Sequence, residues 1–228
     1  MDINKYWSVI DDARSTTGSD QEAMLRCVET TLTQLPAEEV AEWFGIHQEY
    51  LHLADCENIE KAISLCNLSF SDDSFLYFRG WLLSLGKVAF YSIVNNPGKL
   101  SAYIHSSNDA RFESFVYPGS EVYINKAFSE EYGSEGMKQW KETWYAQNPD
   151  KGEFALNMAL GDKYNIWNAS AKHPLSAAAK EEIRLDLFSH SSGRKKSPLS
   201  DQIQSASTRA SDSHSSPDFP VKNQDPER

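Results

Sequence analysis

The chain has 228 residues, of which 40% are hydrophobic and 12% aromatic, and its 33 acidic and 22 basic residues give a formal net charge of −11 at pH 7. With 11 glycines, nine prolines and three cysteines, it is neither a collagen-like chain nor a small disulfide-stapled scaffold. The negative charge also argues against general nucleic-acid binding, which needs a basic surface to neutralise phosphates. The composition therefore predicts an acidic globular protein with a substantial hydrophobic core.

The first predicted helix lies at the start of the chain. Apolar residues recur at the i, i+3, i+4 and i+7 spacing of one helix face between Ile3 and Ile10. The pair Thr17–Gly18 ends this helix, because glycine favours the residue after a helix C-terminus. Ser19 and Glu22 have the spacing of a capping box, so we expect Ser19 to start a second helix.

A third and a fourth helix are predicted next. Pro36 suits the first turn of a helix, and the two glutamates that follow suit the positive end of its dipole. The apolar face of the third helix comprises Val40, Trp43, Phe44, His47, Tyr50 and Leu51. A shorter helix is predicted over residues 57–68.

The most informative segment is SDDSFLYFRGWLLSLG, residues 71–86. Ser71 can cap a helix that has Asp72 and Asp73 in its first turn, where carboxylates are favoured. Gly80 lies inside this helix, where glycine costs about 1 kcal/mol relative to alanine. We therefore expect Gly80 to allow close packing against another backbone.

The helical pattern weakens beyond residue 100. Two helices are predicted over residues 109–117 and 119–132, and a last helix over residues 176–188. Sustained alternation of apolar and polar residues, which would indicate strands, is almost absent. We therefore predict an all-α fold, with a compact multi-helix domain over residues 1–188.

Residues 189–228 differ in composition from the rest of the chain. They contain 11 serines, four prolines and one aromatic residue, which is typical of a disordered tail. Residues 1–188 hold 28 acidic and 16 basic residues, a net charge of −12, whereas the tail has a net charge of +1. The acidity therefore belongs to the helical domain. The basic run at residues 194–196 is interpreted as solvated charge rather than a docking or localisation site.

The cysteines and the N-terminal residues predict the compartment. Cys27, Cys56 and Cys66 are odd in number and form no C-x-x-C pair, which is typical of reduced thiols in the cytoplasm. The opening MDINKYWSVIDDAR lacks the apolar stretch of a secretory signal. No apolar run approaches the ~20 residues that cross a bilayer. We expect a cytoplasmic protein without a membrane partner.

The segments MDINKYWSVIDDAR, Leu-Pro-Ala-Glu-Glu-Val at residues 35–40 and SDDSFLYFRGWLLSLG resemble a bacterial family catalogued as a domain of unknown function. The Ser-Asp-Asp…Tyr-Phe-Arg-Gly-Trp-Leu motif is the most specific part of the resemblance, which covers about residues 1–130. The resemblance implies a cytosolic helical protein. Some members of the family are associated with a molybdenum-metabolism regulator. It implies no defined activity, and residues 133–188 match nothing in it.

The strongest candidate site combines Asp72, Asp73 and Arg79, with Tyr77 and His47 nearby. Paired carboxylates next to a cation can perform acid–base chemistry or bind a polar ligand. The alternative is structural: Ser71 and the two aspartates form a helix cap and first turn, and Arg79 joins two helices through an ion pair or a carbonyl. We favour this alternative, because capping explains both aspartates without a ligand.

Other arrangements give weaker signals. His52 and Asp55 have the i, i+3 spacing of a helical pair, but His47 is five residues from His52, which does not place two ligands on one face. No metal motif, phosphate-binding loop or nucleophile motif is present. We therefore expect no metal and no cofactor.

Two classes of function remain open. The first is a non-enzymatic interaction protein, such as an immunity or antitoxin-like protein or a regulatory adaptor, whose acidic surface binds a basic protein partner. The second is an enzyme or small-ligand sensor with a polar pocket near Asp72, Asp73 and Arg79. We favour the first class, because the acidity is the strongest functional signal in the sequence and no catalytic motif is present.

Overall fold

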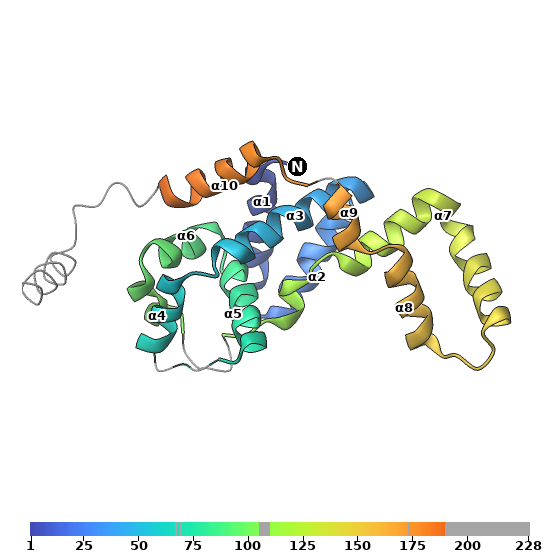
Figure 1. Cartoon of the computed structure of the whole chain (residues 1–228), viewed down its shortest axis with the longest axis horizontal. Coiled ribbons are helices and arrows are strands. Elements are labelled where there is room, and N and C mark those ends of the chain that lie inside the picture. The colour runs from blue at the N-terminus through green and yellow to red at the C-terminus, as the bar shows by residue number, and fades with distance from the viewer. Residues whose placement is uncertain (67, 69, 105–109, 173, 190–228) are drawn as a thin grey trace, which may run out of the picture. The chain divides into compact units, whose positions relative to one another are not determined.

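Most of the sequence patterns that predict helices correspond to helices in the structure. The computed structural model describes residues 1–66, 68, 70–104, 110–172 and 174–189. This part of the chain contains helices and connecting turns without any strand, which confirms the all-α prediction (Figure 1). The helices are α1 (Ile3–Thr17), α2 (Gln21–Leu32), α3 (Ala37–Leu53), α4 (Glu57–Leu65), α5 (Asp72–Ser84), α6 (Lys87–Asn95), the 3₁₀ helices η1 (Pro97–Ala102) and η2 (Glu113–Val116), α7 (Ser120–Gln147), α8 (Glu153–Lys163), α9 (Ile166–Lys172) and α10 (Ala177–Ser189).

The first two helices begin at aspartates. The Asp2 carboxylate accepts a hydrogen bond from the backbone N–H of Lys5, and the Asp20 carboxylate accepts one from Ala23. The prediction of a cap at Ser19 is therefore wrong by one residue. Gly18, at a φ of 61°, ends α1, and its N–H still bonds to the last turn of that helix. Ser19 therefore lies in the connection between α1 and α2, and the next residue, Asp20, is the N-cap of α2.

Helix α3 is the central element of the core. Nine of its 17 residues are buried, and they include the whole apolar face predicted from the sequence. It contacts α1, α5, α7, α9 and α10. A helix that is buried on most of its circumference needs apolar residues on more than one face, which α3 supplies with Trp43, Phe44 and Ile46 in one turn.

Helix α5 packs closely against the segment that contains η2. A Cβ atom at Gly80 would lie 2.8 Å from the carbonyl oxygen of Phe112 and 3.1 Å from a methyl group of Val116. The expected close backbone approach at Gly80 is thus confirmed. The Phe112 N–H donates to the Tyr77 carbonyl oxygen at 3.0 Å. The predicted helix over residues 109–117 is wrong, because among the described residues 110–117 only Glu113–Val116 is helical and it forms a 3₁₀ turn.

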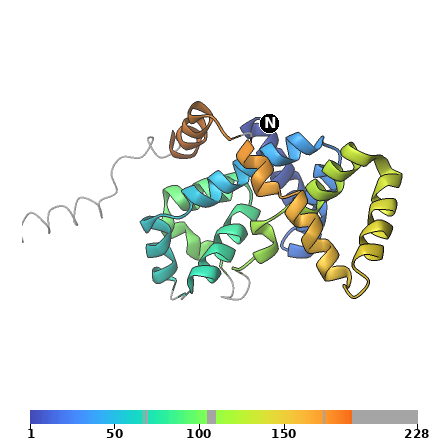
Figure 2. The ribbon, with the colours of Figure 1, turned by 45° about the vertical axis from the view of Figure 1, so that its right-hand side comes forward.

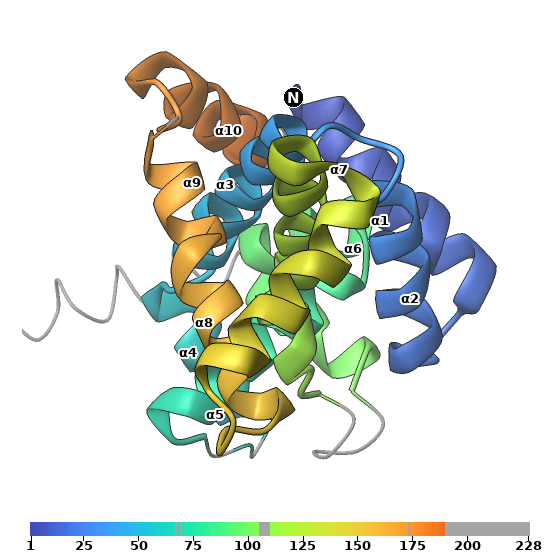
Figure 3. The same ribbon diagram turned by 90° about the vertical axis from the view of Figure 1, so that its right-hand side faces the viewer.

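Helices α7 and α8 form a hairpin with its own small core. Gly133, at φ 74° and ψ 171°, bends α7 into two parts, and most other residues disfavour this positive φ. Phe128 of α7 packs with Leu156, Leu160 and Tyr164. Figure 3 shows α8 beside α7, and they also share an ion pair at 3.2 Å between the Lys163 ammonium and Glu131.

The chain then returns to the central core. Helix α9 packs against α3, and α10 contacts α3 and α6 (Figures 1 and 2). Ile183 and Leu187 of α10 are buried. The described residues belong to one unit of the fold, Met1–His190. The predicted disordered tail starts at residue 189, but Ser189 is the last residue of α10. Residues 190–228 of the predicted tail lie outside the described part of the chain.

Candidate functional site

Arg79 joins α5 to the C-terminal end of α3. Its Nη1 donates to the carbonyl oxygen of Leu51 at 3.1 Å and lies 2.9 Å from a carboxylate oxygen of Asp55. Its guanidinium also stacks over the Phe75 ring, 4.9 Å from the centroid. A cation is favoured at the C-terminal end of a helix, where carbonyl groups lack partners within the helix. Asp55 thus pairs with Arg79, and its expected partner His52 makes no ion pair with it.

The two aspartates of the candidate site lie in the first turn of α5. Ser71 is the N-cap, and its hydroxyl accepts a hydrogen bond from the Ser74 N–H at 3.4 Å. Asp72 and Asp73 are both exposed to solvent. Tyr77, further along α5, bonds to the Glu113 carboxylate, which raises the pKa of the tyrosine. These contacts correspond to the helix cap that the sequence favoured.

His47 is fully buried in the core. Its Nε2 lies 2.8 Å from the Phe115 carbonyl oxygen, and its Nδ1 lies 3.0 Å from the Tyr6 hydroxyl. Because a carbonyl can only accept, Nε2 carries the proton, and Nδ1 accepts from Tyr6. Burial lowers the pKa of His47 to about 4, against the smaller opposite effect of the bond to Phe115. The imidazole is therefore neutral at pH 7 and joins α1, α3 and η2.

The structure gives the five candidate residues separate surroundings. Arg79 binds α3, the two aspartates face solvent, and His47 is enclosed by aromatic side chains. None of the cavities described below is lined by any of the five. The geometry therefore supports packing and capping contacts for these residues.

A chain of buried and partly buried hydrogen bonds links α1, α3, α6 and α10. The Tyr91 hydroxyl lies 2.7 Å from the Tyr50 hydroxyl, 3.2 Å from Trp7 Nε1 and 2.7 Å from a carboxylate oxygen of Asp186. Burial and the neighbouring oxygens raise the pKa of Tyr91 well above its usual value. The Lys87 ammonium lies 2.9 Å from the same Asp186 oxygen. Sequence reasoning missed this network, because residues that bond to each other in it are separated by up to 95 positions in the chain.

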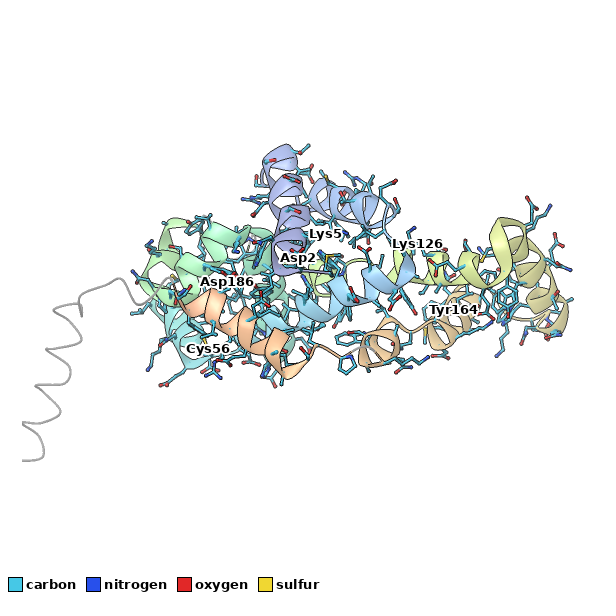
Figure 4. The ribbon with its side chains drawn as sticks, turned by 90° about the horizontal axis from the view of Figure 1, so that it is seen from above. Asp2, Lys5, Cys56, Lys126, Tyr164 and Asp186 are labelled. Atoms are coloured by element: carbon cyan, nitrogen blue, oxygen red, sulfur yellow. The ribbon has the colours of Figure 1, made fainter. Side chains whose placement is uncertain are left out.

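Two shallow cavities flank the first turn of α1. One, of about 450 Å³, lies toward the start of α3, and the other, of about 600 Å³, lies toward α10. We call the seven carboxylates that line them the acidic face: Asp2, Glu38, Glu39, Glu42, Glu181, Glu182 and Asp186. Figure 4 labels two of these carboxylates, Asp2 and Asp186.

Part of the charge on the acidic face is neutralised. Lys5 pairs with Glu39 at 2.5 Å, the amino group of Met1 pairs with Glu42, and Asp186 pairs with Lys87. The bond to Lys5 lowers the pKa of Glu39.

Glu181 and Glu182 are exposed and form no ion pair with the described residues. The face therefore keeps a net negative charge.

A third cavity, of about 740 Å³, lies between α2 and α7. Glu29, Glu121 and Glu130 line it together with Arg26 and Lys126, the last of which is labelled in Figure 4. Burial and the neighbouring Glu121 raise the pKa of Glu29, and a hydrogen bond to the Gly119 backbone opposes this shift. Two cations nearly balance the three carboxylates of this cavity, so it carries less net negative charge than the seven-carboxylate acidic face.

Neither a metal cluster nor a membrane span is found among the described residues. No group of three or more histidine, cysteine, aspartate or glutamate side chains in that part of the chain is placed to hold a metal ion. None of the helices there combines the length and the apolar character that a membrane crossing requires.

The fold and its surface define an all-α protein with an acidic face. Residues 1–125 match the family described as "Protein of unknown function (DUF4240)", and the chain belongs to this family. The match ends within α7, so most of α7 and the three helices that follow lie outside it. No curated protein and no solved structure matches the chain.

Proposed function

We propose that this protein is a non-enzymatic interaction protein of the bacterial cytoplasm, which binds a basic protein partner through its acidic face. The observation that carries the proposal is the gathering of seven carboxylates on both sides of the first turn of α1. They come from α3 and α10 as well as from Asp2, so three distant parts of the sequence contribute. Complementary charge of this kind steers a basic partner and sets its orientation.

The cavity beside α10 also offers apolar contact. Leu185 is 60% exposed and Ile3 is half-buried, and both line this cavity with Glu181 and Glu182. Apolar contacts surrounded by charged groups are typical of protein interfaces. An immunity-like protein that masks a basic site and a regulatory adaptor are two forms of this function. A link to molybdenum metabolism stays a prediction from the family resemblance.

The test compares the full chain with two variants of equal charge. Glu181→Gln/Glu182→Gln removes two carboxylates of the acidic face, and Glu142→Gln/Asp162→Asn removes two from the α7–α8 hairpin. Partners captured from the native host are identified by mass spectrometry, purified and titrated against each protein. We expect the first variant to bind about three- to tenfold more weakly, because exposed charge pairs contribute roughly 0.2–1 kcal/mol each. Wild-type affinity should fall as salt rises.

The hairpin variant should bind like the wild type. Equal weakening by both variants would mean that net charge alone, rather than the acidic face, attracts the partner. Binding that neither variant nor salt changes would contradict the proposal.

A further inference from the structure

Helix α10 is held to the core by few apolar contacts. Only Ile183 and Leu187 among its 13 residues are buried. Leu185, on the opposite side, is 60% exposed. A helix with so little buried surface opens at a lower free-energy cost than the core helices. Specific polar contacts must therefore account for much of its placement.

Asp186 ends the buried hydrogen-bond chain. The Tyr91 hydroxyl donates its single proton to the Asp186 carboxylate at 2.7 Å. It therefore accepts from Trp7 Nε1 and from the Tyr50 hydroxyl. The Lys87 ammonium, 2.9 Å from the same carboxylate oxygen, supplies the opposite charge. If Asp186 were removed, the oriented Tyr91 hydroxyl and the Lys87 ammonium would remain side by side. Together they would suit a carboxylate from another helix.

Two further contacts fix the direction of α10. Near its start, the Lys180 ammonium lies 3.0 Å from Glu49 of α3. In its last turn, the Leu187 carbonyl oxygen accepts a hydrogen bond from Asn95 Nδ2 at 2.8 Å. A helix bound in the reverse direction would bring its lysine to Lys87 and its aspartate to Glu49. The core thus recognises a helix by its charge order and by a free carbonyl at its C-terminal end.

We call the surface under α10 the acceptor face: Trp7, Glu49, Tyr50, Lys87, Tyr91 and Asn95. All six residues lie in the part of the chain that matches the family, whereas α10 lies outside it. We propose that the acceptor face is a binding site for an amphipathic helix of a partner protein, which α10 occupies in this chain as a displaceable helix. The partner helix carries a basic, an aliphatic, an acidic and an aliphatic residue at the positions of Lys180, Ile183, Asp186 and Leu187.

This inference does not rest on the proposed function of the acidic face. It connects the two surfaces, because Glu181, Glu182 and Asp186 belong to both α10 and the acidic face. A partner helix that displaces α10 would remove these three carboxylates from the cavity beside α1. The two binding events should therefore oppose each other.

The first experiment measures whether α10 opens independently in the full chain. Hydrogen exchange is followed by mass spectrometry, peptide by peptide, without denaturant and at rising urea concentrations. We expect the amides of residues 177–189 to exchange before those of α3 and α5. Exchange of α10 only together with α3 would overturn the proposal, because the helix would then not be displaceable.

The second experiment adds the α10 helix as a separate peptide and measures its binding to the protein. The probe is a fluorescent synthetic peptide of residues 174–189, titrated against full-length Leu187→Ala and, as the matched control, full-length Leu185→Ala. Leu187 is fully buried and Leu185 is exposed, so only the first substitution should release the resident helix. We expect the peptide to bind the Leu187→Ala protein at least about tenfold more tightly than the control.

Two altered peptides test whether the charged residues of the helix determine its binding. A peptide with Asp186→Asn should bind about tenfold more weakly, because it loses a charge-assisted hydrogen bond and an ion pair. A peptide with Lys180→Glu should also weaken, because Glu49 would repel it. Equal binding of all three peptides to a protein that keeps its near-ultraviolet circular dichroism would overturn the proposal. A concentration-dependent dimer that needs Leu187 would assign the helix to a second copy of the chain and overturn the assignment to a partner protein.

Discussion

His47 shows how a single residue can look functional in the sequence and act in packing. It lies between Tyr6 and the Phe115 carbonyl oxygen, and Trp43 stacks on it with ring centroids 5.1 Å apart. Both ring nitrogens have partners, so no lone pair is left for a metal ion or a substrate. The low pKa of about 4 follows from burial, and it makes the neutral form part of the folded state.

The first prediction concerns the pH dependence of stability. The folded pKa of His47 is about 4 and its unfolded pKa is about 6.5. Between these values the unfolded chain binds a proton that the folded chain does not bind, so acidification favours unfolding. The histidine should thus cost about 2–3 kcal/mol of unfolding free energy between pH 7.5 and 4.5. His47→Gln should remove this loss.

Urea titrations of both proteins at several pH values measure the effect. The difference in unfolding free energy between wild type and His47→Gln should change with pH, because the carboxylates titrate alike in both. Parallel curves would show that His47 takes up its proton at the same pH in the folded and the unfolded protein, so that burial does not lower its pKa.

At the scale of elements, the contact between α5 and η2 places Gly80, in the motif of the family resemblance, against the core. Gly80 belongs to that motif, and its missing side chain lets the Phe112 carbonyl and Val116 approach the helix. Arg79, the preceding residue, binds the end of α3. The Arg-Gly pair thus joins α3, α5 and η2. These contacts explain why this part of the motif consists of an arginine and a glycine.

The second prediction compares two glycines inside helices. Alanine at Gly80 would place its Cβ 2.8 Å from a backbone carbonyl oxygen, which cannot move without shifting η2. Gly80→Ala should therefore destabilise the protein by about 1–3 kcal/mol, despite the better helix propensity of alanine. Gly161→Ala in α8 meets no atom within 4 Å and should stabilise by up to about 1 kcal/mol. Thermal and urea unfolding of both variants measure these changes. Destabilisation by both substitutions would contradict the steric explanation.

At the scale of the molecule, the net charge of −12 over residues 1–188 opposes the folded state. Like charges on a compact domain repel one another, and salt weakens this repulsion. We expect Tm to rise by roughly 2–4 °C between 20 and 300 mM NaCl. The increase should be smaller for Glu181→Lys/Glu182→Lys, which brings the charge of this part to −8. A fall in Tm with salt would show that ion pairs such as Arg79–Asp55 outweigh the repulsion.

Most helices could be predicted from the sequence, because periodicity and capping involve residues within one or two turns of each other. The largest error arose where distant contacts decide the local structure. Residues 110–117 were predicted to be helical, but they are held between α3 and α5 by the bonds to His47, Gln48 and Tyr77. Such long-range bonds can favour an extended segment with a short 3₁₀ turn over a regular helix.

The candidate site was predictable only in part. The cap at Ser71 and the first-turn aspartates are local features and were recognised as such. The partners of Arg79 lie 24 and 28 residues away, and the acidic face combines residues from both ends of the described chain. No spacing rule connects residues at such separations.

The sequence by itself therefore determined the helical class, most helix positions and the acidity of residues 1–188, because composition and short-range periodicity encode these properties. Only the tertiary structure decided which carboxylates share a surface and which groups the Arg79 guanidinium binds. It also decided that Asp186 of α10 bonds to Tyr91. These properties depend on how helices far apart in the chain pack against α3, and the cost of burying unpaired polar groups selects their partners.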